Sequence, residues 1–309
     1  MAVVLGLLVS LAYGCGDFLG GLSTKRARVT AVVAGLFAIS TAAISLVTLG
    51  WGLVADLPSP TSGDLLLGVG TGLIGPLALG LLYEGLASGR MSVVAPITAV
   101  VAAVVPFAWG LSQGERPGTT ALVGVGLALL GVLAVSGAPA HPGNDSPTAG
   151  STTNLSRPAE ASTARTVGLA LGAGVGFGAV YVMLGSTSDQ AWLWPLVVAR
   201  PISLLTVILG VGATLLLAGD EREEARTRLV APRAVWPMVA GAGILDVTAN
   251  SLYITATRLG PLSIVAVLSA LYPAATVVLA RVVLHERLHR LQLVGLALAT
   301  TGVVAMATG

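Results

Sequence analysis

The stretch ERPGTTALVGVGLALLGVLAVSG, residues 115–137, recurs in altered form as ERLHRLQLVGLALATTGVVAMATG, residues 286–309. The offset is 171 residues (286 minus 115) and needs no gap. Matching glycines and leucines arise easily in an apolar chain, but a Glu-Arg pair at the same place between two apolar segments does not. The offset therefore indicates an internal repeat. It pairs Ser92 with Ser263, Glu115 with Glu286, Arg116 with Arg287, Gly124 with Gly295 and Gly131 with Gly302.

The composition places this repeat in a membrane. Of the 309 residues, 55% are hydrophobic and 10% are charged, and the mean hydropathy is +0.90. Soluble domains carry about 25% charged residues, so we expect the bilayer to be the solvent of this chain. The net charge of +2 gives no reason to expect a nucleic-acid partner. Cys15 is the only cysteine, so no internal disulfide can form.

Apolar stretches long enough to cross roughly 30 Å of hydrocarbon recur along the chain. Between residues 138 and 165, Pro, Ser, Thr, Gly and Ala dominate, and we expect a disordered linker there. The linker separates two domains, 1–137 and 166–309, with five helices each. The expected helices are 2–22, 29–54, 64–87, 91–111, 118–137, 166–186, 190–218, 234–257, 260–283 and 290–308.

The repeat predicts how the two halves are related. The offset carries the fourth expected helix onto the ninth and the fifth onto the tenth. Because each half has an odd number of crossings, every helix of the second half crosses in the direction opposite to its partner. We therefore predict an all-α integral membrane protein whose ten transmembrane helices form two inverted five-helix repeats, an arrangement common in secondary transporters.

The basic residues predict the orientation in the membrane. Ten Lys and Arg residues fall in the short loops on one side of the predicted topology and two on the other. The positive-inside rule puts the richer side in the cytoplasm, and therefore both termini outside it. The two are Arg116 and Arg258, and the ten are Lys25, Arg26, Arg28, Arg90, Arg222, Arg226, Arg228, Arg233, Arg287 and Arg290.

The segment YPAATVVLARVVLHERLHRLQLVGLALATTGVV, residues 272–304, resembles the ten-helix, EamA-type branch of the drug/metabolite transporter superfamily. Family members similarly place a Pro, a Glu thirteen residues later and a Gly-rich last helix, which here are Pro273, Glu286, Gly295 and Gly302. The first half matches Glu115, Gly124 and Gly131 but has Ala102 in place of that Pro. The stretches AYGCGDFLGG (12–21) and WPLVVARP (194–201) resemble the family's first and seventh helices.

The resemblance implies two inverted five-helix repeats around a central cavity, and members that move small metabolites or drugs. In this reading Pro273, Glu115 and Glu286 are structural motif residues. The family is usually described with both termini in the cytoplasm, which conflicts with the count of basic residues in this chain. The orientation therefore stays open between these two indications.

Charged residues inside the expected helices are the candidate site. Each costs about 2.5–3.5 kcal/mol at a helix centre, so such residues are usually kept for a function or for a buried pair. Glu84 and Arg281 lie near helix ends, from which their side chains can reach the interface. We expect the remaining three and their neighbours to bind substrate in a central cavity, with Asp246 as the proton-coupling candidate. The substrate-binding candidates are Asp17, Arg200, Asp246, Asn250 and Tyr253.

An enzymatic alternative rests on HERLH, residues 285–289. His285 and His289 could hold zinc while Glu286 activates water, as in an intramembrane zinc metalloprotease. The repeat argues against this, because Glu286 has a copy at Glu115 whereas the two histidines align with Gly114 and Gly118. A phosphate-binding G-x-x-x-x-G-K-[ST] motif is also missing from the sequence, which favours secondary transport over ATP hydrolysis.

We therefore expect a secondary transporter, an exporter or exchanger, of small metabolites or drugs. It would work by alternating access as a multi-pass protein of the plasma membrane, with no enzymatic activity, cofactor or metal. Its expected partners are a small-molecule substrate and the lipid bilayer, and a homodimer is an open option. The sequence leaves the substrate, the direction of transport and the coupling ion undecided.

Overall fold

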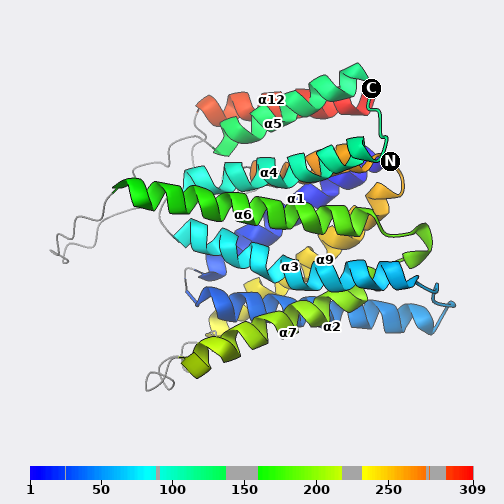
Figure 1. The fold of residues 1–309 in the computed structure, drawn as a ribbon, viewed down its shortest axis with the longest axis vertical. Helices are drawn as coiled ribbons and strands as arrows, with labels where there is room; N and C mark the ends of the chain where they lie inside the picture. Colours follow the sequence, from blue (N-terminus) through cyan, green and yellow to red (C-terminus); the bar gives the residue numbers. More distant parts are fainter. Residues whose placement is uncertain are drawn as a thin grey trace.

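The computed structural model describes residues 1–24, 26–87, 91–136, 159–217, 232–275, 278 and 290–308. Within these ranges the chain forms ten α-helices and two short 3₁₀ turns, and no strand (Figure 1). The helices are α1 (Ala2–Thr24), α2 (Val29–Gly52), α3 (Ser62–Ala87), α4 (Met91–Ser112), α5 (Thr119–Ser136), α6 (Ala159–Gly185), α7 (Trp194–Leu217), α9 (Trp236–Thr257), α10 (Leu262–Ser269) and α12 (Arg290–Thr308).

Six of these helices contain a segment long and apolar enough to cross a membrane: α1, α2, α3, α6, α7 and α12. Shorter apolar segments lie in α4 and α5 and at Leu262–Ala275. Helix α9 belongs to neither group, because it carries Asp246, Thr248 and Asn250 in its middle. Backbone N–H and C=O groups find no water in a bilayer, which is why such apolar segments fold as helices.

The helices lie close to their expected positions, with two differences at boundaries. Helix α6 begins at Ala159, so the last part of the segment assigned to the linker is helical. Residues 138–158, which make up the rest of the linker, lie outside the described residues. Helix α10 ends at Ser269, although the sequence predicted one helix over 260–283.

Pro273 explains the early end of α10. A proline has no N–H to donate to the carbonyl four residues earlier, here Ser269, and its ring disfavours helical geometry at the residue before it. The chain turns at Ala270 and Leu271 and becomes helical again at Tyr272. Helix α4 carries Ala102 at the equivalent position in the repeat and runs unbroken from Met91 to Ser112.

The helices pack side by side in a layered bundle, with α5 and α12 at one edge and α2 and α7 at the other (Figure 1). Helix α1 packs against α9 and α10, and helix α6 packs against α3 and α4. Helix α2 contacts α9 and α7, and α3 also contacts α7. Both chain termini lie at the same end of the bundle (Figure 1).

Four glycines bring α5 and α12 into backbone contact. A Cβ on Gly131 would lie 2.6 Å from the Ala299 nitrogen and 2.7 Å from the Gly295 oxygen. A Cβ on Gly124 would lie 2.7 Å from the Gly302 oxygen. Gly124 therefore lies against Gly302 and Gly131 against Gly295, which makes the two helices antiparallel. The sequence offset relates the same four glycines, but it pairs Gly124 with Gly295 and Gly131 with Gly302.

Candidate functional site

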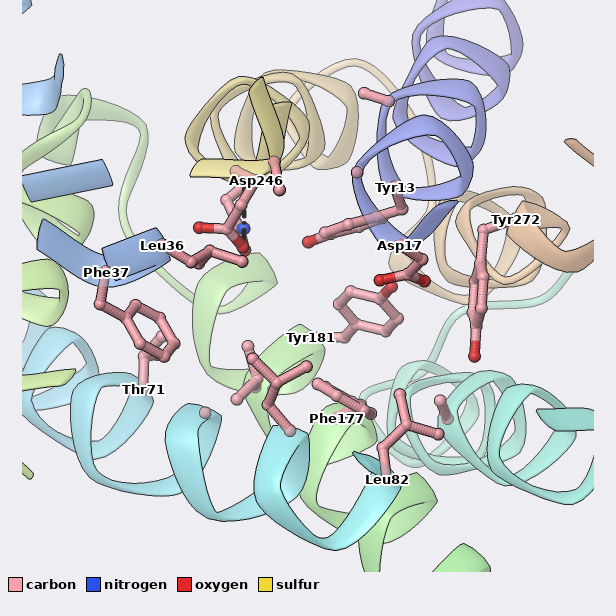
Figure 2. Close-up of a pocket in the computed structure, with 18 of the residues that line it drawn as sticks. Tyr13, Asp17, Leu36, Phe37, Thr71, Leu82, Phe177, Tyr181, Asp246 and Tyr272 are labelled. Atoms are coloured by element: carbon pink, nitrogen blue, oxygen red, sulfur yellow. Dashed lines mark hydrogen bonds between the residues drawn. The ribbon is translucent and has the colours of Figure 1, made fainter. Parts of the chain in front are cut away.

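A cavity lies at the centre of the bundle, between residues from both halves of the chain (Figure 2). About 860 Å³ of space free of protein atoms lies in the cavity and its mouth, including open solvent. Helices α1, α2, α3 and α4 contribute to its wall, and so do α6, α7 and α9. Its polar and aromatic lining is Tyr13, Asp17, Phe37, Thr71, Tyr83, Phe177, Tyr181, Arg200, Asp246, Asn250 and Tyr272.

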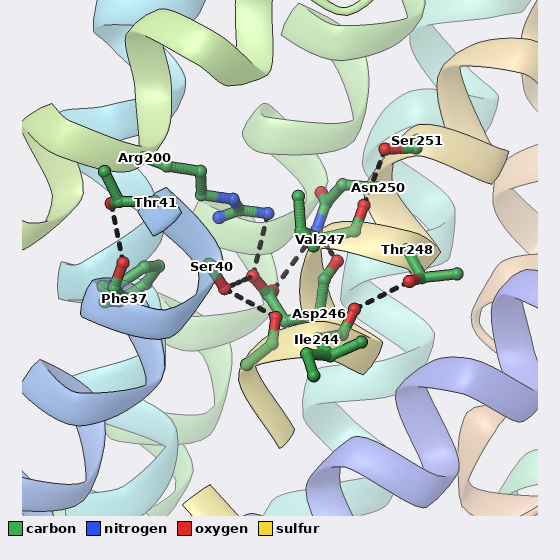
Figure 3. A network of polar contacts seen from close by, with 11 residues as sticks. Phe37, Ser40, Thr41, Arg200, Ile244, Asp246, Val247, Thr248, Asn250 and Ser251 are labelled. Carbon is green, nitrogen blue, oxygen red and sulfur yellow. Dashed lines mark hydrogen bonds and ion pairs between the residues drawn. The ribbon is translucent and has the colours of Figure 1, made fainter. Parts of the chain in front are cut away.

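The two charges predicted to act together form an ion pair. Arg200 Nη2 of α7 lies 3.0 Å from Asp246 Oδ2 of α9 (Figure 3). Asn250 Nδ2, one turn along α9, donates to the Asp246 carbonyl at 2.7 Å and to its Oδ1 at 3.2 Å. The Ser40 hydroxyl of α2 lies 2.7 Å from the Gly243 carbonyl and 3.0 Å from Asp246 Oδ2, so it can donate to either. Three helices thus hold the Asp246 carboxylate in place.

The two partners of the pair differ in exposure. The Arg200 side chain is 5% exposed and the Asp246 side chain is 22% exposed. Although Nη2 is close to the carboxylate, Nε and Nη2 of Arg200 have no well-aligned hydrogen-bond acceptor among the described residues. The guanidinium also lies 5.7 Å from the centre of the Phe37 ring, a cation–π contact. Arg200 is therefore buried behind Asp246, and the carboxylate is the part of the pair nearer the open space.

Asp17 of α1 is a second carboxylate at the cavity. It is partly buried, and its side chain lies among Tyr13, Tyr181 and Tyr272 (Figure 2). In the described part of the chain no hydrogen bond or ion pair joins the Asp17 side chain to another residue. The Tyr13 and Tyr181 rings lie 6.1 Å apart, centre to centre, and form one aromatic wall beside it.

Four of the five predicted binding residues line this cavity: Asp17, Arg200, Asp246 and Asn250. Tyr253 does not belong to the lining. Its side chain is fully buried, its ring stacks on Tyr181 at 4.7 Å, and its hydroxyl donates to the Tyr181 carbonyl at 3.2 Å. Tyr253 shares a helix face with Asp246 and Asn250 but lies about one turn beyond Asn250 on α9. There its ring packs against the ring of Tyr181 and does not line the cavity.

Most of the aromatic lining was not predicted. Tyr13, Phe177 and Tyr181 belong to helices whose apolar pattern is the same on every side, so the sequence did not single them out. Tyr272 could have been found from its position before Pro273, because a broken helix re-aims the neighbouring side chains. Thr71 is 2% exposed, and its hydroxyl has no hydrogen-bond partner among the described residues.

Glu115 has a clear structural task. Its Oε1 accepts the N–H of Leu262 at 2.7 Å and its Oε2 accepts the N–H of Ser263 at 3.0 Å. These are the first two residues of α10, where N–H groups have no partner within the helix. The loop between α4 and α5 is thereby fastened to α10 of the other half. Glu286, its copy in the repeat, lies outside the described residues.

A polar cluster at the end of the bundle that carries the termini joins three connections. Asp64 and Thr61 form a capping box at the start of α3, and Asp64 also accepts the Ser188 N–H and hydroxyl, both at 2.8 Å. Arg258, after α9, donates to the carbonyls of Ser188 and Trp192 at 3.3 and 3.1 Å. Burial lowers the pKa of the Arg258 guanidinium, and Asp189 and Asp64 act in the opposite direction. We call Thr61, Asp64, Ser188 and Arg258 the latch.

The enzymatic alternative falls on a part of the chain that the structure does not describe. His285, Glu286 and His289 all lie between residues 279 and 289. Among the described residues no group of three His, Cys, Asp or Glu side chains could hold a metal ion. The wall of the cavity carries carboxyl groups and aromatic rings.

Comparison with known proteins agrees with the fold. Residues 164–308 match the model of the EamA-like transporter family. This match confirms the resemblance drawn from residues 272–304, and it supports a membrane transporter in general. A comparison with curated proteins finds no match.

A solved crystal structure, described only as "Crystal structure of protein", has a similar fold. The TM-score is 0.70 at 16% sequence identity, over 98% of this chain and 94% of that chain. At this identity the likeness shows the fold alone. It extends, however, over the first half of the chain, which the family match does not cover.

Proposed function

We propose that this protein is a secondary transporter that moves small metabolites or drugs across the plasma membrane by alternating access. The observation that carries the proposal is the central cavity, which is lined by charged and aromatic side chains from both halves of the chain. Inverted-repeat transporters bind substrate near the bilayer midplane, at the interface of their repeats. Arg200, Asp246, Asn250 and Asp17 are the proposed binding residues, and Asp246 is the coupling candidate.

The helix contacts support an inverted repeat. If α1, α2, α3, α4 and α5 are exchanged with α6, α7, α9, α10 and α12, the contact of α1 with α9 becomes that of α6 with α3. In the same way α1 with α10 becomes α6 with α4, and α2 with α9 becomes α7 with α3. The exchange also turns the contact of α5 with α12 into itself, and the glycines in this contact run antiparallel. A chain built in this way has two nearly equivalent arrangements, one open to each side of the membrane.

The latch indicates which of these two arrangements the structure represents. It ties the start of α3 to the connection between α6 and α7, at the end with the termini. The cavity residues Leu82 and Tyr83 lie near the other end of α3. At 1.5 Å per helical residue, Asp64 and Leu82 are separated by roughly 27 Å. We infer that this conformation is closed at the latch and gives access from the opposite end.

Reconstitution tests the proposal directly. A thermal-shift screen of the purified protein against amino acids, sugars, nucleosides and cationic drugs would identify ligands. Proteoliposomes loaded with an unlabelled hit should then accumulate the same compound in labelled form by exchange. Empty liposomes and liposomes with the Asp246→Asn variant serve as controls. A protein that binds ligands but exchanges none of them in sealed liposomes would contradict the proposal.

A further inference from the structure

The charges of the cavity do not balance. Among the described residues its wall carries two carboxyl groups, Asp17 and Asp246, and one guanidinium, Arg200. The 3.0 Å ion pair neutralises Arg200 with Asp246, and Asp17 is left as a carboxyl group with no counter-ion among the described residues. A carboxylate in an apolar surrounding is costly unless a positive group meets it. The wall therefore has room for one more positive charge, beside Asp17.

The accessible part of the wall is also negative. The Arg200 side chain is 5% exposed, and its Nε and Nη2 are buried behind Asp246. The Asp246 side chain is 22% exposed, and Asp17 is likewise only partly buried. An anion entering the cavity would meet carboxylates before it could reach the guanidinium. A cation would meet a carboxylate that has no other partner in the described chain.

The walls around Asp17 suit a cation with an apolar body. Tyr13, Tyr181 and Tyr272 lie around its carboxylate, and Phe177 lies on the same side of the cavity (Figure 2). The faces of aromatic rings attract ammonium groups and pack well against apolar or aromatic groups. Tyr253 stacks on Tyr181 at 4.7 Å and so fixes one of these rings from outside the cavity.

We propose that the cavity binds organic cations, namely protonated amines with an apolar or aromatic body, and that Asp17 is their counter-ion. The ammonium group would lie between the Asp17 carboxylate and the rings of Tyr13, Tyr181 and Tyr272. The body would extend toward Phe177 and Leu82. This inference rests on the proposed transport function for its purpose, but the binding site stands on the cavity itself.

Three ligands with one aromatic body test the charge preference. At neutral pH 2-phenylethylamine is a cation, phenylacetate an anion and 2-phenylethanol uncharged. Calorimetric titration of the full-length protein in detergent should show binding of the amine, with the other two at least about tenfold weaker. Equal affinity for all three ligands, or a preference for phenylacetate, would overturn the proposal.

Variants of Asp17 test the counter-ion. Asp17→Asn should weaken amine binding roughly 10- to 100-fold and leave 2-phenylethanol binding unchanged, because only a charged hydrogen bond is lost. Asp17→Glu keeps the charge and should keep the preference for the amine. Asp56→Asn removes an exposed carboxylate outside the cavity and is the matched control. If Asp17→Asn binds the amine as well as the wild type does, the proposal is wrong.

Transport assays separate this proposal from the proposed function. If the protein binds the amine through Asp17 but exchanges no compound in proteoliposomes, the binding site is supported and the transport function is contradicted. If the protein exchanges neutral or anionic compounds but does not bind the amine, the transport function is supported and the cation site is contradicted. If Asp17→Asn does not give a folded protein, Asp17→Glu and the three-ligand series on the wild type still test whether the cavity prefers cations.

Discussion

At the scale of single residues, the ion pair of Arg200 and Asp246 joins α7 to α9 in the interior of the bundle. A buried pair is weak evidence of stabilisation, since the cost of removing two charges from water offsets their attraction. Breaking such a pair is nevertheless expensive, because one charge is left buried alone. Arg200 is 4% exposed, so it depends on Asp246 more than Asp246 depends on it.

We expect Asp246→Asn to abolish transport and to lower the free energy of unfolding by about 3 kcal/mol, because Arg200 keeps its charge without a counter-ion. The double variant Arg200→Leu with Asp246→Leu should recover stability, since no charge is left in the interior, but not transport. Thermal unfolding in detergent and exchange in proteoliposomes measure the two effects. If the double variant recovered both, the pair would be only structural.

At the scale of helices, the start of α10 depends on a residue from the other half of the chain. Pro261 precedes the helix and has no side-chain acceptor to cap it, so the first N–H groups of α10 bond to the Glu115 carboxylate. This contact gives a structural role to Glu115, the glutamate of the first Glu-Arg pair. The Glu115 carboxylate takes the place of an N-cap side chain for α10, a helix far away in the sequence.

Glu115→Ala should lower the free energy of unfolding by about 1–2 kcal/mol, because it leaves the Leu262 and Ser263 N–H groups without an acceptor. Glu115→Gln retains one side-chain oxygen and should lie between wild type and Ala. Arg116→Ala removes the exposed neighbouring charge and should change little. The midpoint of thermal unfolding in detergent is the measurement, and equal midpoints for Glu115→Ala and Arg116→Ala would contradict the cap.

The contact of α5 with α12 gives a second test at this scale. Gly131→Ala would place a methyl group 2.6 Å from the Ala299 nitrogen, so the helices must separate, at about 1–3 kcal/mol. Gly126 lies on the exposed side of the same helix, with nothing within 4 Å of an added Cβ. Gly126→Ala should therefore be neutral or slightly stabilising. Similar unfolding midpoints for the two variants would show that α5 and α12 do not pack as described.

At the scale of the whole molecule, one end of the bundle is held together by the latch and by the Glu115 cap. Arg258, one of two basic residues that the sequence assigns to this end, donates to the carbonyls of Ser188 and Trp192. It is therefore part of the fold rather than a free surface charge.

We expect the latch end to face away from the cytoplasm. In a Cys15→Ala background, a cysteine at Gln113, exposed between α4 and α5, should react with a membrane-impermeant maleimide added to intact cells. A cysteine at Ala27, between α1 and α2, should react only after the cells are opened. The positive-inside rule is the physical reason. The reverse labelling pattern would support the orientation usual for the resembled family.

The sequence by itself determined the membrane class, the positions of the helices and the two copies of Glu-Arg. It could do so because apolar length, punctuation by Pro and Gly, and an ungapped offset are local or periodic properties of the chain. It also named Asp17, Arg200, Asp246 and Asn250, since a charged or amide group in an apolar helix stands out wherever the helix lies.

Only the tertiary structure decided what these residues meet. It paired Arg200 with Asp246 across two helices and left Asp17 among tyrosines. It showed that Tyr253 packs against Tyr181 outside the cavity lining, and that Glu115 accepts an N–H from the start of α10. Helices that are apolar on every side do not reveal which face turns inward, because lipid and protein interior are equally apolar. The aromatic wall of the cavity therefore depends on packing between distant segments, which no local pattern in the sequence records.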